Sequence, residues 1–175
     1  GGDTVRALDV DPRPGASATA TSTLLFGVPG VGGDLPDLLA APTALAVEPG
    51  GGALFVADTG NHRVRRLPLV RDAGGAVVGV DAAAVVDVVG TGEPASSGDG
   101  APSSSFPVQS PRGLAFDSFG NLFVSSTRTV RVVTPSPLTS VVDGGGAVLT
   151  IYGALPRDAF PEDSTFCLSG LDLVD

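Results

Sequence analysis

The chain of 175 residues contains 25 glycines and 15 prolines, and 42% of its residues are apolar while 17% are charged. Disordered chains combine low hydrophobicity with high charge, so this composition, with a mean hydropathy of +0.31, excludes disorder. It indicates many short buried segments joined by turns. The net charge of −9 repels phosphate groups, which argues against nucleic acid or an anionic membrane surface as a partner.

The single cysteine, Cys167, permits no disulfide within the chain, and no apolar run approaches the roughly 20 residues that a membrane-spanning helix needs. The sequence does not open with a charged segment followed by an apolar one. We therefore expect any export signal to have been removed or to lie outside this chain. The expected localisation is extracellular, cell-surface or periplasmic.

Short segments rich in Val, Leu and Phe alternate in polarity with a period of two residues and are bounded by Gly, Pro and Asp. This pattern predicts β-strands rather than helices. Helix is expected only as a turn or two at 35–41 and in the other long connections, because no apolar stripe of helical period exceeds about ten residues. In chain order the predicted strands are 4–8, 23–27, 42–49, 53–57, 63–67, 85–90, 111–118, 122–125, 129–133, 148–153 and 168–174.

The predicted strands repeat in groups of four. The segments PTALAVEP (42–49), PRGLAFDS (111–118) and LSGLDLV (168–174) are alike and open successive groups. A four-stranded unit that recurs along a chain, and is too small to bury its own faces, is typical of a propeller blade. The predicted fold class is therefore all-β, a β-propeller of four-stranded antiparallel blades, with about three blades' worth in this chain.

The repeat predicts a division of this one propeller domain. Residues 1–27 form the end of a preceding blade, 28–90 and 91–153 form two blades with their crossovers, and 154–175 form a crossover and the first strand of a following blade. Such an arrangement would leave apolar faces and strand edges exposed at both ends. We expect the remaining blades to come from the rest of a longer polypeptide or, as the second choice, from a second copy in a homodimeric six-bladed ring.

The string PTALAVEPGGGALFVADTGNHRVRRL (42–67), followed by VVGTGEPASSGDGAP and SPRGLAFDSFGNLFVSS, resembles bacterial NHL repeats. The resemblance is specific from Pro42 to Val133 and extends by fragments to both ends. It implies a β-propeller, commonly with six blades. The second copy departs from the pattern, because SST (125–127) replaces the ADTGNH turn of the first and the loop between the two strands is two residues shorter.

The turn from Asp58 to His62 carries the residues that invite a functional interpretation. His62 is the only histidine, so a Ser-His-Asp triad or an imidazole zinc site would have to use it, and no Gly-x-Ser-x-Gly motif accompanies it. We therefore interpret Asp58, Asn61 and His62 as structural repeat residues, with the Asp58 carboxylate bonded to nearby amides. The predicted sets of catalytic and cofactor-binding residues are empty.

Three arginines recur at one position of the third strand in each group, namely Arg6, Arg65 and Arg131. Each can pair with a carboxylate on a neighbouring strand, which predicts a structural role for all three.

Acidic residues in the long connections are the candidate metal ligands. Asp34, Asp99 and Asp158 each precede a proline by two or three residues, which favours a capped turn. The alternative is calcium, with Asp99, Asp158, Glu162 and Asp163 as candidate ligands. These stretches hold too few or too irregularly spaced carboxylates for a dedicated calcium loop, so the turn is preferred.

Three function classes remain. The preferred one is a non-catalytic propeller segment that serves as a protein-interaction or structural scaffold in a larger secreted or surface protein. The family resemblance also allows part of a metal-dependent propeller enzyme, of the lyase or lactonase type, whose site lies largely outside this segment. RNA binding, which some eukaryotic NHL propellers perform, is disfavoured by 19 acidic against 10 basic residues and a single tyrosine. The expected partners are another protein or the remaining blades.

The alternation of the first two strands in each group also predicts which side chains lie between adjacent blades. They are Leu45, Val47, Leu54, Val56, Leu114, Phe116, Leu122 and Val124.

Overall fold

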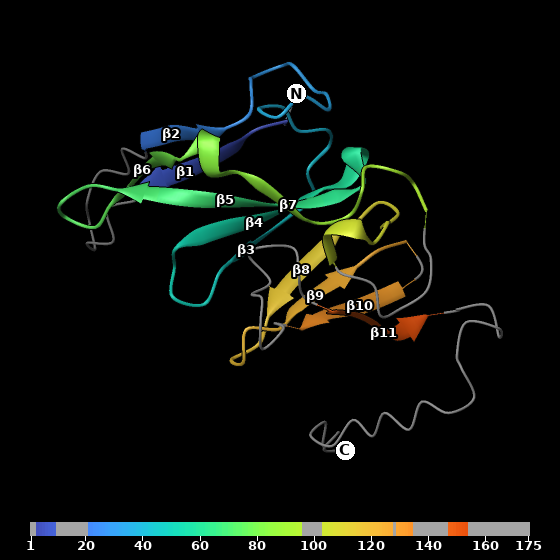
Figure 1. Cartoon of the computed structure of the whole chain (residues 1–175). Helices are drawn as coiled ribbons and strands as arrows, with labels where there is room; N and C mark the ends of the chain where they lie inside the picture. Colours follow the sequence, from blue (N-terminus) through green and yellow to red (C-terminus); the bar gives the residue numbers. More distant parts are fainter. Residues whose placement is uncertain (1–2, 10–20, 96–102, 128, 135–146, 154–175) are drawn as a thin grey trace, which may run out of the picture.

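The computed structural model describes residues 3–9, 21–95, 103–127, 129–134 and 147–153. These residues form three antiparallel β-sheets, labelled by strand in Figure 1. Three short 3₁₀ turns are present, η1 (Thr59–Asn61), η2 (Ala82–Ala84) and η3 (Ser103–Ser105), and the described part of the chain contains no α-helix. The prediction of an all-β chain is confirmed.

The first sheet pairs β1 (Val5–Asp9) with β2 (Thr21–Phe26). The second sheet begins with the order β3 (Ala44–Val47), β4 (Ala53–Asp58), β5 (Arg63–Arg71). Two further strands, β6 (Val77–Val80) and β7 (Val86–Val89), both pair with β5. The third sheet runs in the order β8 (Gly113–Phe116), β9 (Leu122–Ser125), β10 (Thr129–Thr134), β11 (Ala147–Gly153).

Strand β6 lies between the predicted strands 63–67 and 85–90, where the sequence pattern predicts no strand. Strand β5 is nine residues long, so its first half pairs with β7 while its second half extends beyond the sheet and pairs with β6. The Asp72 carboxylate closes this hairpin by accepting hydrogen bonds from the amides of Gly74 and Ala76, both at 2.9 Å. An Asp that binds the amides after it is a strong turn former, and this signal was present in the sequence.

The expected helical turn at 35–41 is also different in the structure. One turn hydrogen bond, from the amide of Leu38 to the carbonyl of Leu35 at 2.9 Å, is formed there without a helix. The guanidinium of Arg65 donates to the carbonyls of Pro36 and Leu38, at 3.3 Å and 2.6 Å. These carbonyls are therefore occupied by a tertiary contact instead of continuing a helix.

Two apolar cores hold the three sheets face to face. The core between the second and third sheets contains Phe55, whose ring meets that of Phe116 edge-on with centroids 4.8 Å apart. The core between the first and second sheets is smaller. Its buried members are Val5, Phe26, Leu39, Val56 and Leu67.

Six of the eight side chains predicted to lie between neighbouring sheets do so: Leu54, Val56, Leu114, Phe116, Leu122 and Val124. For Leu45 and Val47 the prediction is wrong within the described chain, since they are 51% and 58% exposed. Leu45 lies on the face of β3 that is turned toward the first sheet. The first sheet packs instead on β4 and β5, where it covers Val56 and Leu67.

Glycines at the ends of β2 and β7 occupy corresponding places. Gly27 and Gly90 have φ of +88° and +96°, which glycine adopts without the steric cost of a side chain. A Cβ at Gly27 would collide with the carbonyl oxygen of Asp3, and one at Gly90 with that of His62. Asp3 lies two residues before β1 and His62 lies directly before β5, so in both sheets the glycine after one strand packs against the start of the strand paired with it.

We expect the glycine contact to be measurable in the unfolding free energy. Gly90→Ala should cost about 1 to 3 kcal/mol more than Gly50→Ala, because both positions have positive φ but only Gly90 is crowded. Urea unfolding of the two variants provides the comparison. Equal losses would show that the crowding contributes nothing.

The exposure of β3 leads to a second prediction. Leu122→Ala should lower the unfolding free energy by about 2 to 5 kcal/mol, since the side chain is fully buried in the core between the second and third sheets. Leu45→Ala should lower it by about 1 kcal/mol or less, because half of the side chain is already in water. A large loss at Leu45 in a monomer would contradict the packing described above.

Candidate functional site

Buried polar side chains gather at the turn between β4 and β5. Asp58, Thr59, Asn61 and Arg65 are all buried there. The turn contains η1 and ends at His62, whose φ of +52° places it in the left-handed region. Such a concentration of polar groups away from water requires that each finds hydrogen-bond partners.

The Asp58 carboxylate holds together the turn and the connection that leads into β3. Its Oδ1 accepts a hydrogen bond from the amide of Ala40 at 2.7 Å, and its Oδ2 accepts one from Asn61 Nδ2 at 2.8 Å. Asn61 Nδ2 also donates to the carbonyl of Gly33 at 2.7 Å. The predicted bonding of Asp58 to nearby amides is correct in kind, but the amide comes from 18 residues earlier in the chain.

Burial raises the pKa of Asp58 above its ordinary value. The hydrogen bonds from Ala40 and Asn61, and the charges of Arg65 and Arg63, act in the opposite direction. Arg65 Nε lies 3.5 Å from Asp58 Oδ2. Because Asp58 is fully buried and its oxygens already accept these bonds, the carboxylate is not placed to meet a ligand from solvent.

Two arginines and two aspartates form an ion-pair network beside this turn. Arg63 pairs with Asp34 at 2.8 Å and with Asp87 at 2.6 Å, and Arg65 Nε lies 3.2 Å from Asp87 Oδ1. The network borders a hollow of about 200 Å³ between the connection 28–41, β5 and β7. The two positive and two negative charges balance, so the hollow offers no excess charge to an ionic ligand. Sequence reasoning missed this network, although Arg63 and Arg65 alternate on one strand opposite Asp87.

The same turn is bonded to the connection that precedes β8. Thr59 Oγ1 donates to the carbonyl of Pro111 at 2.6 Å. The Thr43 hydroxyl lies 2.7 Å from the Thr59 hydroxyl. His62 Nδ1 accepts a hydrogen bond from the amide of Ser110 at 3.1 Å. The single imidazole therefore links the second sheet to the segment entering the third.

The three recurring arginines have different surroundings. Arg65 pairs with carboxylates as predicted. Arg6 donates to Ser22 Oγ at 2.6 Å, and the residue across the strand pair from it is Leu24, where Arg65 has Asp87. Among the described residues, the contacts of Arg6 are therefore with Ser22, and its pairing with a carboxylate stays a prediction. The buried guanidinium of Arg131 lies over the Phe106 ring, 4.5 Å from its centroid.

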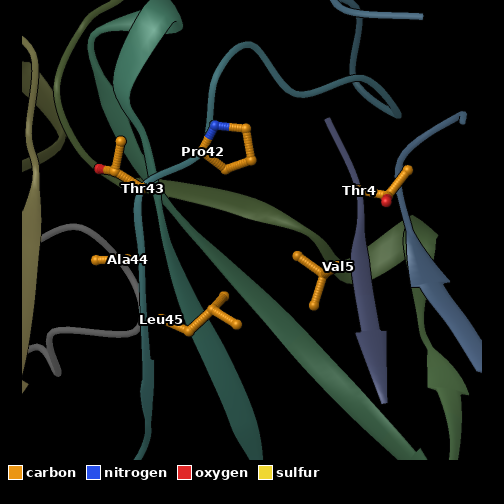
Figure 2. Close-up of a pocket in the computed structure, with 6 residues that line it drawn as sticks. All are labelled: Thr4, Val5, Pro42, Thr43, Ala44 and Leu45. Atoms are coloured by element: carbon orange, nitrogen blue, oxygen red, sulfur yellow. The ribbon is translucent and has the colours of Figure 1, made fainter. Parts of the chain in front are cut away.

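A second hollow, of about 300 Å³, lies between the start of β1 and the start of β3. Figure 2 shows Val5 and Leu45 pointing toward one another across it, while Ala44 points to the other side of β3. The lining is mainly aliphatic with two threonines, Thr4 and Thr43. It contains no ionisable side chain, so acid, base or metal chemistry has no group to start from here.

The candidate calcium ligands Asp99, Asp158, Glu162 and Asp163 lie outside the described residues, as does Cys167. Within the described ranges, no three His, Cys, Asp or Glu side chains come together as a metal site. None of the helical segments in those ranges has the length and apolarity to cross a membrane.

Replacement of the buried carboxylate tests its structural role. Asp58→Asn should lower the unfolding free energy by about 3 kcal/mol, because the amide group cannot accept from both Ala40 and Asn61 and leaves Arg65 with one carboxylate fewer. The matched control is Asp34→Asn, whose side chain is 66% exposed and should cost about 1 kcal/mol or less. Chemical denaturation at neutral pH measures both. Similar small losses would rule out Asp58 as a main determinant of stability.

No protein-family model matches the chain, and no curated protein matches it in sequence. Among solved structures, the fold is similar to that of an auxiliary nutrient binding protein from Bacteroides thetaiotaomicron, with a TM-score of 0.51 and 14% sequence identity. The match covers 85% of this chain and 31% of that chain, so this chain spans about a third of the length of the similar structure. At this level of identity the likeness concerns the fold.

Proposed function

We propose that this chain is a non-catalytic segment of an NHL-type β-propeller, and that it serves as a structural or protein-interaction scaffold in a larger secreted or surface protein. In this proposal the three sheets are consecutive blades, the first represented by its last two strands. The solved structure of similar fold supports the idea of a larger protein, because this chain matches only 31% of that chain's length.

The observation that carries the proposal is that the two side chains best suited to act as a general base are both hydrogen-bonded within the fold. The only imidazole accepts a hydrogen bond from the Ser110 amide, and the buried Asp58 carboxylate accepts from Ala40 and Asn61. A general base needs a lone pair within reach of its substrate. Both groups instead hold connections between strands in place, which favours a scaffold over an enzyme for this part of the chain.

A metal titration tests the proposal against the enzyme alternative. We expect Ca²⁺, Mn²⁺ or Zn²⁺, added to chelator-treated protein, to leave the thermal unfolding curve unchanged. A metal present at 100 times its dissociation constant would stabilise the folded state by about 2.7 kcal/mol, which is readily detected. A metal-dependent rise in melting temperature, reproduced as bound metal in calorimetric titration, would contradict the proposal. If zinc gives that rise, His62→Ala identifies whether the imidazole is the ligand.

A further inference from the structure

Strands β8 and β3 can be compared position by position. Leu114 of β8 is paired with Val124 as Leu45 of β3 is paired with Val56, so the two leucines occupy the same place in their sheets. Leu114 packs against the core between the second and third sheets, whereas Leu45 is half exposed. The same contrast holds for the next residue on that face, Phe116 in β8 and Val47 in β3.

The cover over β8 is supplied by the first two strands of the preceding sheet. Strands β3 and β4 both contact β8, and Phe55 of β4 places its ring edge-on to Phe116. Ala46 of β3, which is paired with Phe55, packs on the same core. A hairpin in the place of β3 and β4, one sheet earlier, would cover Leu45 and Val47 in the same way.

The first sheet has an open edge where such a hairpin would stand. Strands β5 and β10 each have pairing partners on both sides, β4 and β7 for the one and β9 and β11 for the other. Among the described residues, β1 pairs with β2 alone, so its other edge presents backbone groups that can accept a strand. The hollow of about 300 Å³ lies between this strand and β3, with Val5 and Leu45 on its two sides (Figure 2).

We propose that a β-hairpin of this same repeat type, from another part of a longer polypeptide, docks on the open edge of β1 and buries Leu45 and Val47. Its second strand hydrogen-bonds to β1, and its apolar side chains fill the hollow shown in Figure 2. The inference rests on the proposed scaffold role and identifies the surface and the partner. A hairpin from a second copy is disfavoured, because two chains of net charge −9 repel each other.

A chimera supplies the missing strands from the chain itself. Residues 111–128, which include β8, β9 and the turn into β10, are placed directly before Thr4 in exchange for residues 1–3. The junction reproduces the spacing between β9 and β10, since Thr129 begins β10 and Thr4 matches it in the repeat. The matched control carries Phe123→Asp in the added hairpin, because Phe123 is paired in β9 as Phe55 is paired in β4.

The readout is the effect of Leu45→Asp on the folding equilibrium constant in urea. In the natural chain the substitution should change this constant little, and in the chimera it should lower it tenfold or more, because Leu45 is then buried. The control chimera should behave like the natural chain. If the natural chain is too unstable for a baseline, the chimera and its Phe123→Asp control are compared with each other.

Equal effects of Leu45→Asp in the chimera and in its control would overturn the inference. A dimer of the natural chain that Leu45→Asp dissociates, measured by light scattering, would overturn the choice of partner in favour of a second copy. The metal titration tests the proposed function separately. A metal effect with a positive chimera result contradicts the scaffold role alone, and a negative chimera result without a metal effect contradicts the docking alone.

Discussion

The buried carboxylate of Asp58 is the constraint on which the arrangement of the second sheet and its connections depends. It fixes the start of β3 through Ala40, it orients Asn61 toward Gly33, and it lies against the guanidinium of Arg65. A carboxylate without water must be matched by donors, so the segments that supply them cannot move independently. The bonds to this buried charge therefore hold the connection 28–41 and the turn 58–62 in one fixed arrangement.

Stacking of the sheets depends on this constraint because the sheets alone are thin. A twisted four-stranded sheet buries its apolar residues only against another sheet, and here alternate positions of β4 serve the two interfaces. Ala53 and Phe55 pack toward the third sheet, and Leu54 and Val56 pack toward the first. The turn after β4 adds polar contacts to the connections that lead into β3 and β8, with Asn61 donating to Gly33 and Thr59 donating to Pro111. Apolar packing thus supplies the driving force, while the polar turn determines the lateral position of one sheet on the next.

The parts of this structure that sequence could predict are those set by short-range rules. Strand positions follow from two-residue alternation, and the turn at Asp58 follows from residues that bind their own backbone. The partners of Asp58 and Arg65 could not be predicted, because Ala40 and Leu38 reach them only after the connection folds back. The exposure of Leu45 could not be predicted either, because a strand pattern states which side chains share a face and not whether another sheet covers it.

Strand β6 was missed for a different reason. The repeat suggested four strands in every group, and this expectation outweighed a local hairpin signal at 72–76. The surroundings of the recurring arginines also differ, since Asp87 lies across from Arg65 and Leu24 lies across from Arg6. A sequence repeat predicts the strands that all copies share. The features in which one copy differs have to be predicted from the residues of that copy.

The pairing of strands with their neighbours in sequence has a consequence for how the chain is made. Within the second and third sheets, β3 to β5 and β8 to β11 each form an antiparallel meander, so most backbone pairing closes short loops. A sheet can therefore form soon after its last strand leaves the ribosome. The apolar face of that sheet then serves as the template on which the next one condenses, so the order of synthesis and the order of stacking are the same.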